Sequence, residues 1–430
     1  MSVNASNLGM SIEQAGKVLN AAFKQATGQD VISKLATGDY VSIATMAQRV
    51  GYESMTNALS QVLNRTYIRV RAYAAKFGDL IKTEEQYGNM MRKITYIDRD
   101  IPEGDLTRDI EDGKEYNPYK VRKPQAIQTA YNGFNHIDDY ITIFKNQWDT
   151  ALSSGSELQR FISGIMQEWY NKLEQYHEQY SRATLINLIG GTQAYNKDTA
   201  VTGASLTRPE MVRHLLTEYN EEHGTTLTCD KLFSDKAAFT QFAEDLAYKM
   251  DIIVRQMGER TTLYHVSPLK SITAEGVAVT IPIKRHTPRE NLQCYMLAPF
   301  WDRVKRVVRP GLFANEYLEY IKFNEVAFWQ DINTPEQINA EVSYFKPAVA
   351  NVAGSKTTYA VNNDSGEAAV ELPYVLGVMF DDEAAAICYK NMWSAATPMN
   401  PAHGFQTNYI HEDVQWRNDN TENCCVLLLD

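Results

Sequence analysis

The spacing of apolar and polar positions singles out residues 156–189 as the longest periodic stretch of the chain. Apolar side chains recur every three or four residues, no proline interrupts them, and the only glycine inside the stretch is Gly164. This pattern predicts one amphipathic helix, capped by Ser156 and stopped by Gly190-Gly191. At 1.5 Å per residue it would be about 50 Å long, against about 11–12 residues for an ordinary helix. We therefore expect a strut with one face packed on its own domain.

The region before the strut divides into an arm and a long excursion. Residues 1–88 contain two shorter helical patterns, at 11–26 and 53–77, without enough apolar surface to fold alone, which indicates an arm that packs on something else. Residues 89–136 are punctuated by proline and glycine and have no helical period. The apolar residues at the two ends of this excursion are spaced so that two extended strands can pair: Ile94, Tyr96, Ile127 and Tyr131.

The excursion is acidic on its outgoing limb and basic where it returns. With too few apolar residues for a core, it is either disordered or docked on a neighbouring molecule, and the alternation at its base favours docking. We expect contacts to another molecule from its charged side chains: Asp98, Asp100, Asp105, Asp109, Glu111, Lys120, Arg122 and Lys123.

Two further regions have the pattern of folded domains. Residues 137–206 contain the strut, and the apolar side chains that precede it predict helix or strand core: Ile137, Tyr140, Ile141, Phe144 and Trp148. Residues 207–372 predict a central α/β domain. Its first helix is expected to open at Thr207 with a capping box and to end near Gly224, and a second helix is expected over 234–257.

The remaining elements are mostly strands, so the fold class is α+β. Strands are expected at 277–283, 292–297, 325–330, 373–380 and 405–411, with helices near 300–307 and 334–340 and an exposed loop at 350–368. Residues 373–430 are expected to return as strands to the two domains. The apolar end, 424–429, is expected to lie in a sheet, because a free tail of this kind would aggregate.

Composition narrows the functional classes. The five cysteines are odd in number and form no CxxC pair, which predicts reduced and mostly buried thiols. No stretch approaches eighteen uninterrupted apolar residues, so we expect no membrane span, and the N-terminus lacks the pattern of a secretory signal. The net charge of −11 argues against a protein that grips nucleic acid with a basic surface, but it does not exclude a container for nucleic acid.

No catalytic or cofactor-binding motif is found, and we expect neither a metal nor a cofactor. His411-Glu412-Asp413 is the only compact group of metal-ligand side chains. On a strand, alternation would place His411 and Asp413 on one side and Glu412 on the other, so at most two could share a metal. We interpret the group as a strand end that reaches solvent.

The order of these parts resembles the major capsid proteins of tailed bacteriophages, which share the HK-ninety-seven-type fold, and most of all those of small short-tailed phages. The resemblance rests on a charged excursion followed by residues 131–134, a long helix that ends in residues like 180–185, and the C-terminal segment 377–416. It implies an N-terminal arm (1–88), an extended β E-loop (89–136), a peripheral or P domain with the long spine helix (137–206), an axial or A domain of α/β type (207–372) and returning strands (373–430).

The resemblance implies a function as well. The chain would self-assemble as hexamers and pentamers into an icosahedral or prolate shell, in the host cytoplasm, with a separate scaffolding protein and a portal as partners. The shell would enclose double-stranded DNA without sequence-specific binding. Two alternatives stay open: a metal-dependent hydrolase or nuclease that uses the acidic loop 98–115, and a minor virion structural protein.

Overall fold

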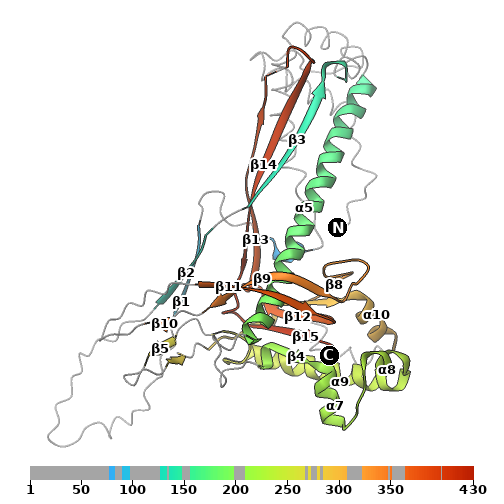
Figure 1. Ribbon diagram of the computed structural model, residues 1–430, viewed down its shortest axis with the longest axis vertical. Helices are drawn as coiled ribbons and strands as arrows, with labels where there is room; N and C mark the ends of the chain where they lie inside the picture. Colours follow the sequence, from blue (N-terminus) through green and yellow to red (C-terminus); the bar gives the residue numbers. More distant parts are fainter. Residues whose placement is uncertain are drawn as a thin grey trace, which may run out of the picture. The chain divides into compact units, whose positions relative to one another are not determined.

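The computed structural model describes thirteen segments of the chain (Figure 1): 77–82, 90–96, 126–132, 135–147, 155–197, 209–266, 270–272, 278–280, 284–307, 322–346, 349–350, 364–398 and 400–430. The helix expected at 11–26, and nearly all of that expected at 53–77, lie outside these residues. The chain forms two compact units. One comprises the described parts of Met1–Gly88, Gly133–Ser181 and Ile387–Gln415, and the other comprises Asn89–Asn132, Arg182–Ala386 and Trp416–Asp430.

The first unit is built on a three-stranded sheet in the order β13-β14-β3. These strands span Ala385–Ala396, Phe405–Asn418 and Asn135–Phe144. β14 and β3 are antiparallel, with partners from Phe405↔Phe144 to Val414↔Asn135. A short 3₁₀ helix, η2 (Gly78–Leu80), precedes a bridge to β13.

Burial alternates along β3, as it does for a strand with one covered face. Ile137 and Ile143 are buried, whereas Tyr140 and Phe144 are 64% and 46% exposed. The strand alternative for this segment is therefore confirmed, but assigning Tyr140 and Phe144 to the core was wrong, because they lie on the opposite face of the strand.

The predicted strut is α5, which spans Gly155–Lys197 and contributes its residues up to Ser181 to the first unit. Figure 1 shows it running beside the sheet. Leu173 is buried, and Tyr180 packs against the cluster of Ile137, Ile387 and Val414. The amphipathic helix is thus confirmed, but it begins at Gly155, so the prediction that Ser156 caps it was wrong.

α5 does not stop at Gly190-Gly191, so that part of the prediction was wrong. A Cβ on Gly190 would lie 2.7 Å from Val342 Cγ1, and one on Gly191 would lie 2.9 Å from the Ser343 carbonyl oxygen. Asn187 holds the same strand, since its Oδ1 accepts from Ser343 N at 2.8 Å and its Nδ2 donates to Ser343 O at 3.1 Å. The glycines are there for a close approach of helix to strand, not for a turn.

The second unit is organised around a five-stranded sheet in the order β4-β15-β12-β7-β8. β15 is parallel to β4 and antiparallel to β12, while β7 is antiparallel to β12 and parallel to β8. Every residue of β15 is buried, so the apolar C-terminal segment is confirmed as a sheet strand. The strands span Val212–His214, Cys424–Leu428, Val375–Asp381, Leu292–Leu297 and Lys322–Val326.

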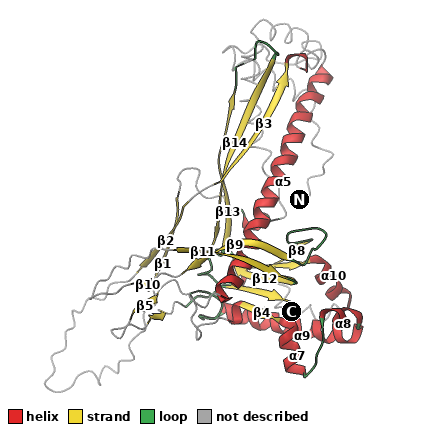
Figure 2. Ribbon diagram, in the orientation of Figure 1, coloured by secondary structure: helices red, strands yellow, loops and turns green. Residues whose placement is uncertain are grey.

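Helices and smaller sheets complete this unit (Figure 2). The helices are α7 (Leu215–His223), α8 (Cys229–Ser234), α9 (Lys236–Gly258) and α10 (Ala298–Val307). The other pairings are β9 (Ile338–Lys346) with β11 (Asp364–Leu372), and β5 (Lys270–Ile272) with β6 (Ala278–Thr280) and β10 (Val349–Ala350). Short 3₁₀ helices, η3 and η4, span Pro209–Met211 and Arg289–Asn291. The α+β class is confirmed.

Four local predictions were wrong in this unit. The strand expected at 325–330 is β8, which lies earlier in the chain and ends at Val326. The chain from Pro209 forms η3 and β4 before α7 starts at Leu215, although α7 does end at Gly224, whose φ of 63° suits a glycine. The helix expected at 334–340 is a turn followed by β9. The end of the loop expected at 350–368 belongs to β11, because its small residues complete a nine-residue ladder with β9, and such tertiary pairing overrides propensity.

The thiols follow the prediction: all five cysteines are free and four are buried. Among the described helices, none is long and apolar enough to cross a membrane.

Candidate functional site

The base of the predicted excursion is an antiparallel pair of strands, which we call the hairpin root. β1 (Met90–Tyr96) pairs with β2 (Ala126–Asn132), from Met90↔Asn132 to Tyr96↔Ala126. The pairing expected from the apolar residues at the two ends of the excursion is therefore confirmed. The eight charged residues predicted to make contacts all lie between the two strands, outside the described residues.

Lys93, on β1, carries the main polar contact of the root. Its Nζ donates to Asp419 Oδ2 at 2.6 Å and also to Glu422 Oε1. The three side chains are only 15%, 4% and 10% exposed. Both carboxylates belong to residues 419–423, the turn between β14 and β15, which we call the C-terminal turn. The cation and its two partners are therefore withdrawn from water together, and such groups are stable only when paired.

Asp419 is held ionised by its neighbours. Burial by itself would raise its pKa, but the charge of Lys93 and the hydrogen bonds from Lys93, Thr421 and Tyr131 outweigh burial and lower the pKa to about 2. Thr421 donates to Asp419 Oδ1 through its N at 3.0 Å and through its Oγ1 at 2.6 Å. For Lys93 the effect of burial has the opposite sign, because burial alone would lower the pKa of an ammonium group. The charges of Asp419 and Glu422, and their hydrogen bonds, outweigh burial and raise the pKa of Lys93.

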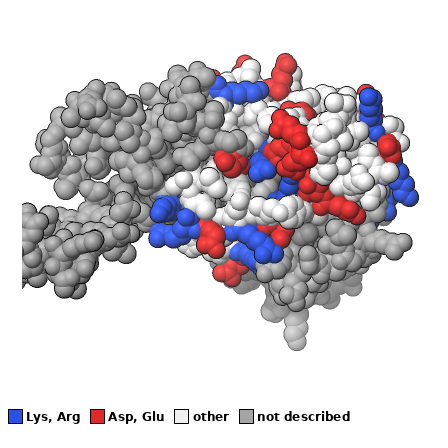
Figure 3. All heavy atoms as spheres, turned by 90° about the horizontal axis from the view of Figure 1, so that it is seen from below, with Lys and Arg blue, Asp and Glu red and all other residues white. Residues whose placement is uncertain are grey.

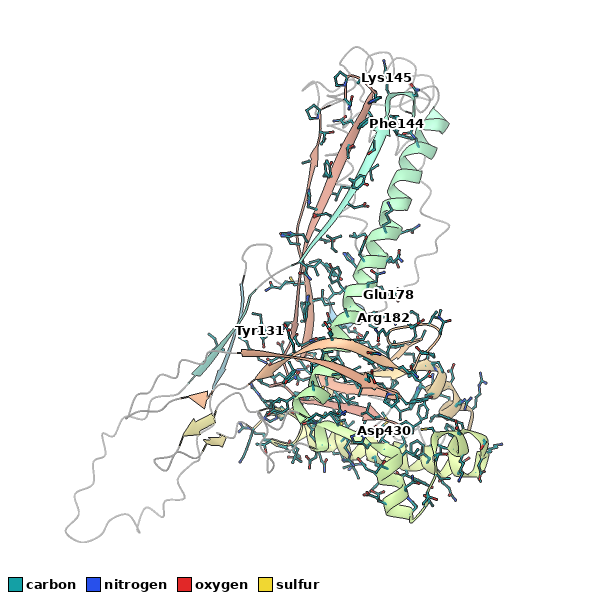
Figure 4. All side chains as sticks on the ribbon, in the orientation of Figure 1. Tyr131, Phe144, Lys145, Glu178, Arg182 and Asp430 are labelled. Atoms are coloured by element: carbon teal, nitrogen blue, oxygen red, sulfur yellow. The ribbon has the colours of Figure 1, made fainter. Side chains whose placement is uncertain are left out.

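Tyr131 ties the second strand of the root to the same turn. Burial first, and then the negative charge of Asp419, raises the pKa of its phenol, which hydrogen-bonds to Asp419. The Tyr131 ring lies 5.9 Å from Arg417 Cζ, and Arg417 Nη2 donates to Glu383 Oε2 at 2.7 Å. Tyr131, on β2, is labelled in Figure 4. Both strands of the root are thus anchored to the C-terminal turn.

Contacts with Arg285 and Ala384 also anchor the C-terminal turn itself. Arg285 Nη2 lies 3.4 Å from Glu422 Oε1, and Arg285 Nε donates to Thr421 O at 3.2 Å. Asp419 N donates to Ala384 O at 2.7 Å. Opposite charges thus lie beside one another throughout this cluster, and their contacts hold the hairpin root against the C-terminal turn.

Sequence reasoning missed this cluster. Lys93 and Asp419 are 326 positions apart, and no local pattern marks either as buried. The only signal was indirect: Asp419 and Glu422 lie in a polar segment just before an apolar strand.

The His411-Glu412-Asp413 group lies well inside β14 rather than at a strand end, so that interpretation was wrong. The predicted alternation is confirmed. His411 Nδ1 lies 2.5 Å from Asp138 Oδ1, and Asp413 Oδ1 lies 2.6 Å from His136 Nδ1, on one face. On the other face the buried Glu412 lies 2.9 Å from His177 Nε2 of α5. Among the described residues, no group of three or more metal-ligand side chains could hold an ion.

Comparison with known proteins gives a family. A family model described as Phi29-like phage major capsid protein matches residues 19–428. No curated protein matches the chain. Among solved structures, the chain resembles the capsid of Staphylococcus phage Andhra with a TM-score of 0.48 and 10% identity, over 84% of this chain and 85% of that chain. It also resembles the mature capsid of bacteriophage PhiM1 with a TM-score of 0.41 and 10% identity, over 83% and 87%.

The family match decides between the functions left open by the sequence. It confirms the resemblance to tailed-phage major capsid proteins and supports neither a hydrolase or nuclease nor a minor virion protein. A major capsid protein is a structural protein of the virion and not an enzyme. Because the match spans almost the whole length, the chain belongs to the Phi29-like phage major capsid protein family.

Proposed function

We propose that this major capsid protein forms hexamers and pentamers in which residues 97–125 of each copy lie on an adjacent copy. The observation that carries the proposal is the hairpin root, whose two strands are fixed by Lys93 and Tyr131 to the buried carboxylate of Asp419. A root anchored in this way fixes the two points between which a loop of 29 residues runs. With so few apolar side chains of its own, that loop gains most by contacting another molecule.

The charges of the loop suit a repeated contact of this kind. The contact residues proposed are acidic from Asp98 to Glu111 and basic from Lys120 to Lys123, so each loop offers both signs to a neighbour. They are Asp98, Asp100, Asp105, Asp109, Glu111, Lys120, Arg122 and Lys123. One exposed ion pair contributes only about 0–1 kcal/mol. Summed over every copy in a closed shell, such contacts make assembly cooperative.

We assign the two units to different places in each hexamer or pentamer. We assign the first unit, with α5 and the β13-β14-β3 sheet, to the peripheral domain at the rim of each hexamer or pentamer. The second unit, with its five-stranded sheet, is assigned to the axial domain at the centre.

The remaining proposals concern partners. The net charge of −11 favours enclosed double-stranded DNA that stays mobile and is not bound to the wall. On the face shown in Figure 3 the largest charged patch is acidic, and basic side chains lie around it. A separate scaffolding protein, a portal and assembly in the host cytoplasm complete the proposal.

Hydrogen exchange of the full chain, as free subunits and as assembled shells, tests the loop contact. We expect residues 97–125 to exchange at least tenfold more slowly in the shell. α9 is the internal control, because its core residues are buried within the subunit and protected in both states. Equal exchange of 97–125 in the two states would refute the contact.

A charge-reversal variant gives a second, independent readout. Lys120→Glu, Arg122→Glu and Lys123→Glu together should lower the yield of closed shells in electron micrographs while the melting temperature of the free subunit stays unchanged. The matched control reverses Lys231 and Lys236, which are exposed on α8 and α9. Shells from the loop variant at the wild-type yield would count against the contact.

A further inference from the structure

The sheet of the first unit has one face that α5 does not cover. α5 contacts the side of β14 on which the buried Glu412 lies 2.9 Å from His177 Nε2. The opposite side, which we call the ladder face, carries side chains of β3 and β14 that lie directly opposite one another in rungs. The five rungs are Phe144 with Phe405, Thr142 with Thr407, Tyr140 with Tyr409, Asp138 with His411, and His136 with Asp413.

The ladder face is aromatic at one end and acidic at the other. At the aromatic end Tyr140, Tyr409 and Phe144 are 64%, 40% and 46% exposed, and a cluster of exposed apolar rings marks an interaction surface. The other end carries the carboxylates of Asp138 and Asp413, and the Asp138 side chain is 63% exposed. The histidines of these rungs are counted as neutral at pH 7, so this end is negative. The face therefore fits a partner that is apolar at one end and basic at the other.

The N-terminal arm joins the sheet at the acidic end of the ladder face. Ile81 forms an isolated bridge with Ile387 of β13, and Lys82 N donates to Ile387 O at 2.9 Å. Ile387 belongs to one buried cluster with Val414, the residue of β14 that follows Asp413 and ends the pairing with β3. The arm is therefore attached to the unit beside the two carboxylates.

Residues 53–76, the last part of the arm before that attachment, match the ladder face in length and width. In the helix that their spacing predicts they would extend about 36 Å, and the ten residues of β14 that pair with β3 extend about 33 Å. A helix about 10 Å wide also covers two strands that lie about 4.8 Å apart. One stripe of the predicted helix is apolar, and it consists of Met55, Leu59, Val62, Leu63, Val70 and Tyr73.

The charges of this segment are complementary to the ladder face in the one direction that the attachment allows. Its basic residues all lie in the half nearer to Phe77, and Arg69 would be about 12 Å from Phe77 along the helix. Asp138 lies about 10 Å along β3 from the acidic end of the pairing. Leu59 would be about 27 Å from Phe77, and Phe144 lies about 30 Å from the acidic end. Arginine would thus face aspartate, and aliphatic side chains would face aromatic rings.

We propose that residues 53–76 form a helix that lies along the ladder face of the same chain, with its basic half at the acidic end. Attachment to the same unit keeps this segment at a high effective concentration over the face, so it competes well with any other chain. The apolar stripe then covers rings that are exposed among the described residues, and the arm gains the packing surface that it lacks by itself. The proposal concerns the free subunit and goes beyond the contact of residues 97–125, so the two fail separately.

The reactivity of one engineered thiol tests the contact in the free full-length chain. Thr142→Cys places the thiol between the two aromatic rungs, in a Cys229→Ser background in which the other native cysteines are buried. Leu59→Asp with Val62→Asp should raise the rate at which this thiol reacts with a maleimide at least tenfold, because carboxylates on the apolar stripe release the helix.

The matched control carries the same two charges on the opposite face of the predicted helix, as Asn57→Asp with Gln61→Asp. It should change the rate by less than about twofold, because these positions point away from the sheet. Equal rates in the two double variants, with both folded by circular dichroism, would overturn the proposal.

Crosslinking in the same background identifies the chain that supplies the segment, and it needs no destabilising charge. A chain with Leu59→Cys and Thr142→Cys should be joined within itself by a bis-maleimide that spans about 10 Å, the width of one helix. Gln61→Cys with Thr142→Cys is the control, because Gln61 lies on the far side of the predicted helix. We expect the Leu59 variant to give at least a fivefold higher yield of the intrachain product in mass spectrometry. Equal yields, or products that join only two different chains, would overturn the proposal.

Discussion

Replacing Lys93 with methionine should destabilise the second unit strongly. The substitution keeps the length of the side chain but leaves Asp419 and Glu422, which are 4% and 10% exposed, without the cation between them. The pKa of Asp419, lowered from 3.8 to about 2, corresponds to about 2–3 kcal/mol of stabilisation of its carboxylate, part of it from Thr421 and Tyr131. Removal of one partner from a buried ion pair typically costs about 3–5 kcal/mol. We therefore expect a loss of about 3 kcal/mol at pH 7.

The loss should depend on pH in a defined direction. Because the pKa of Asp419 is lowered in the folded state, its stabilisation is present above the unfolded pKa near 4 and disappears as pH falls towards about 2. The pKa of Lys93 is raised, so its contribution is complete at every pH below about 10. In Lys93→Met the burial of Asp419 is no longer offset by Lys93 and raises the pKa of this carboxyl, so the difference between wild type and variant should shrink steadily as pH falls.

The loss of unfolding free energy is measured by urea unfolding of the free full-length chain, with hydrogen exchange of the second unit as the readout. Lys231→Met is the matched control, because this lysine is exposed on α8, and it should alter stability by less than about 0.5 kcal/mol. In a double-mutant cycle, Asp419→Asn should recover part of the loss in the Lys93→Met background. A loss below 1 kcal/mol, with no coupling to Asp419, would refute the argument that the cluster is desolvated.

Three further predictions follow from single side chains. Gly191→Ala should lower the free energy of unfolding in urea by about 1–3 kcal/mol, because its Cβ would lie 2.9 Å from Ser343 O. Gly164→Ala is the control and should be neutral or stabilising, because nothing lies within 4 Å of its Cβ. Equal effects of the two substitutions would contradict the packing argument. Burial raises the pKa of Asp381 to about 6, so the folded state binds its proton more tightly and gains stability as pH falls from about 6 to 4; melting curves of Asp381→Asn should lack this gain. A thiol reagent at pH 8 should modify native protein at Cys229 first, the one cysteine that is not fully buried, and Cys229→Ser should abolish that fast phase.

The sequence by itself determined the elements whose signal is local. The period of 156–189 was sufficient for α5, because amphipathic spacing is a property of the helix alone. The apolar end at 424–429 was sufficient for a buried strand, and the alternation at His411-Glu412-Asp413 was sufficient for the sides on which those side chains lie. The order of these parts carried the family resemblance.

The tertiary structure decided everything that depends on partners far away in the chain. Gly190-Gly191 was expected to stop α5, because a glycine pair carries the same local signal whether it ends a helix or admits a strand 150 positions later. β9 and β11 were missed, since each strand is stabilised mainly by the other. Lys93 has no local mark of burial, and only the fold brings it to Asp419. Local periodicity fixes the type of an element, but contact energies between distant segments fix where it ends and which charges it can bury.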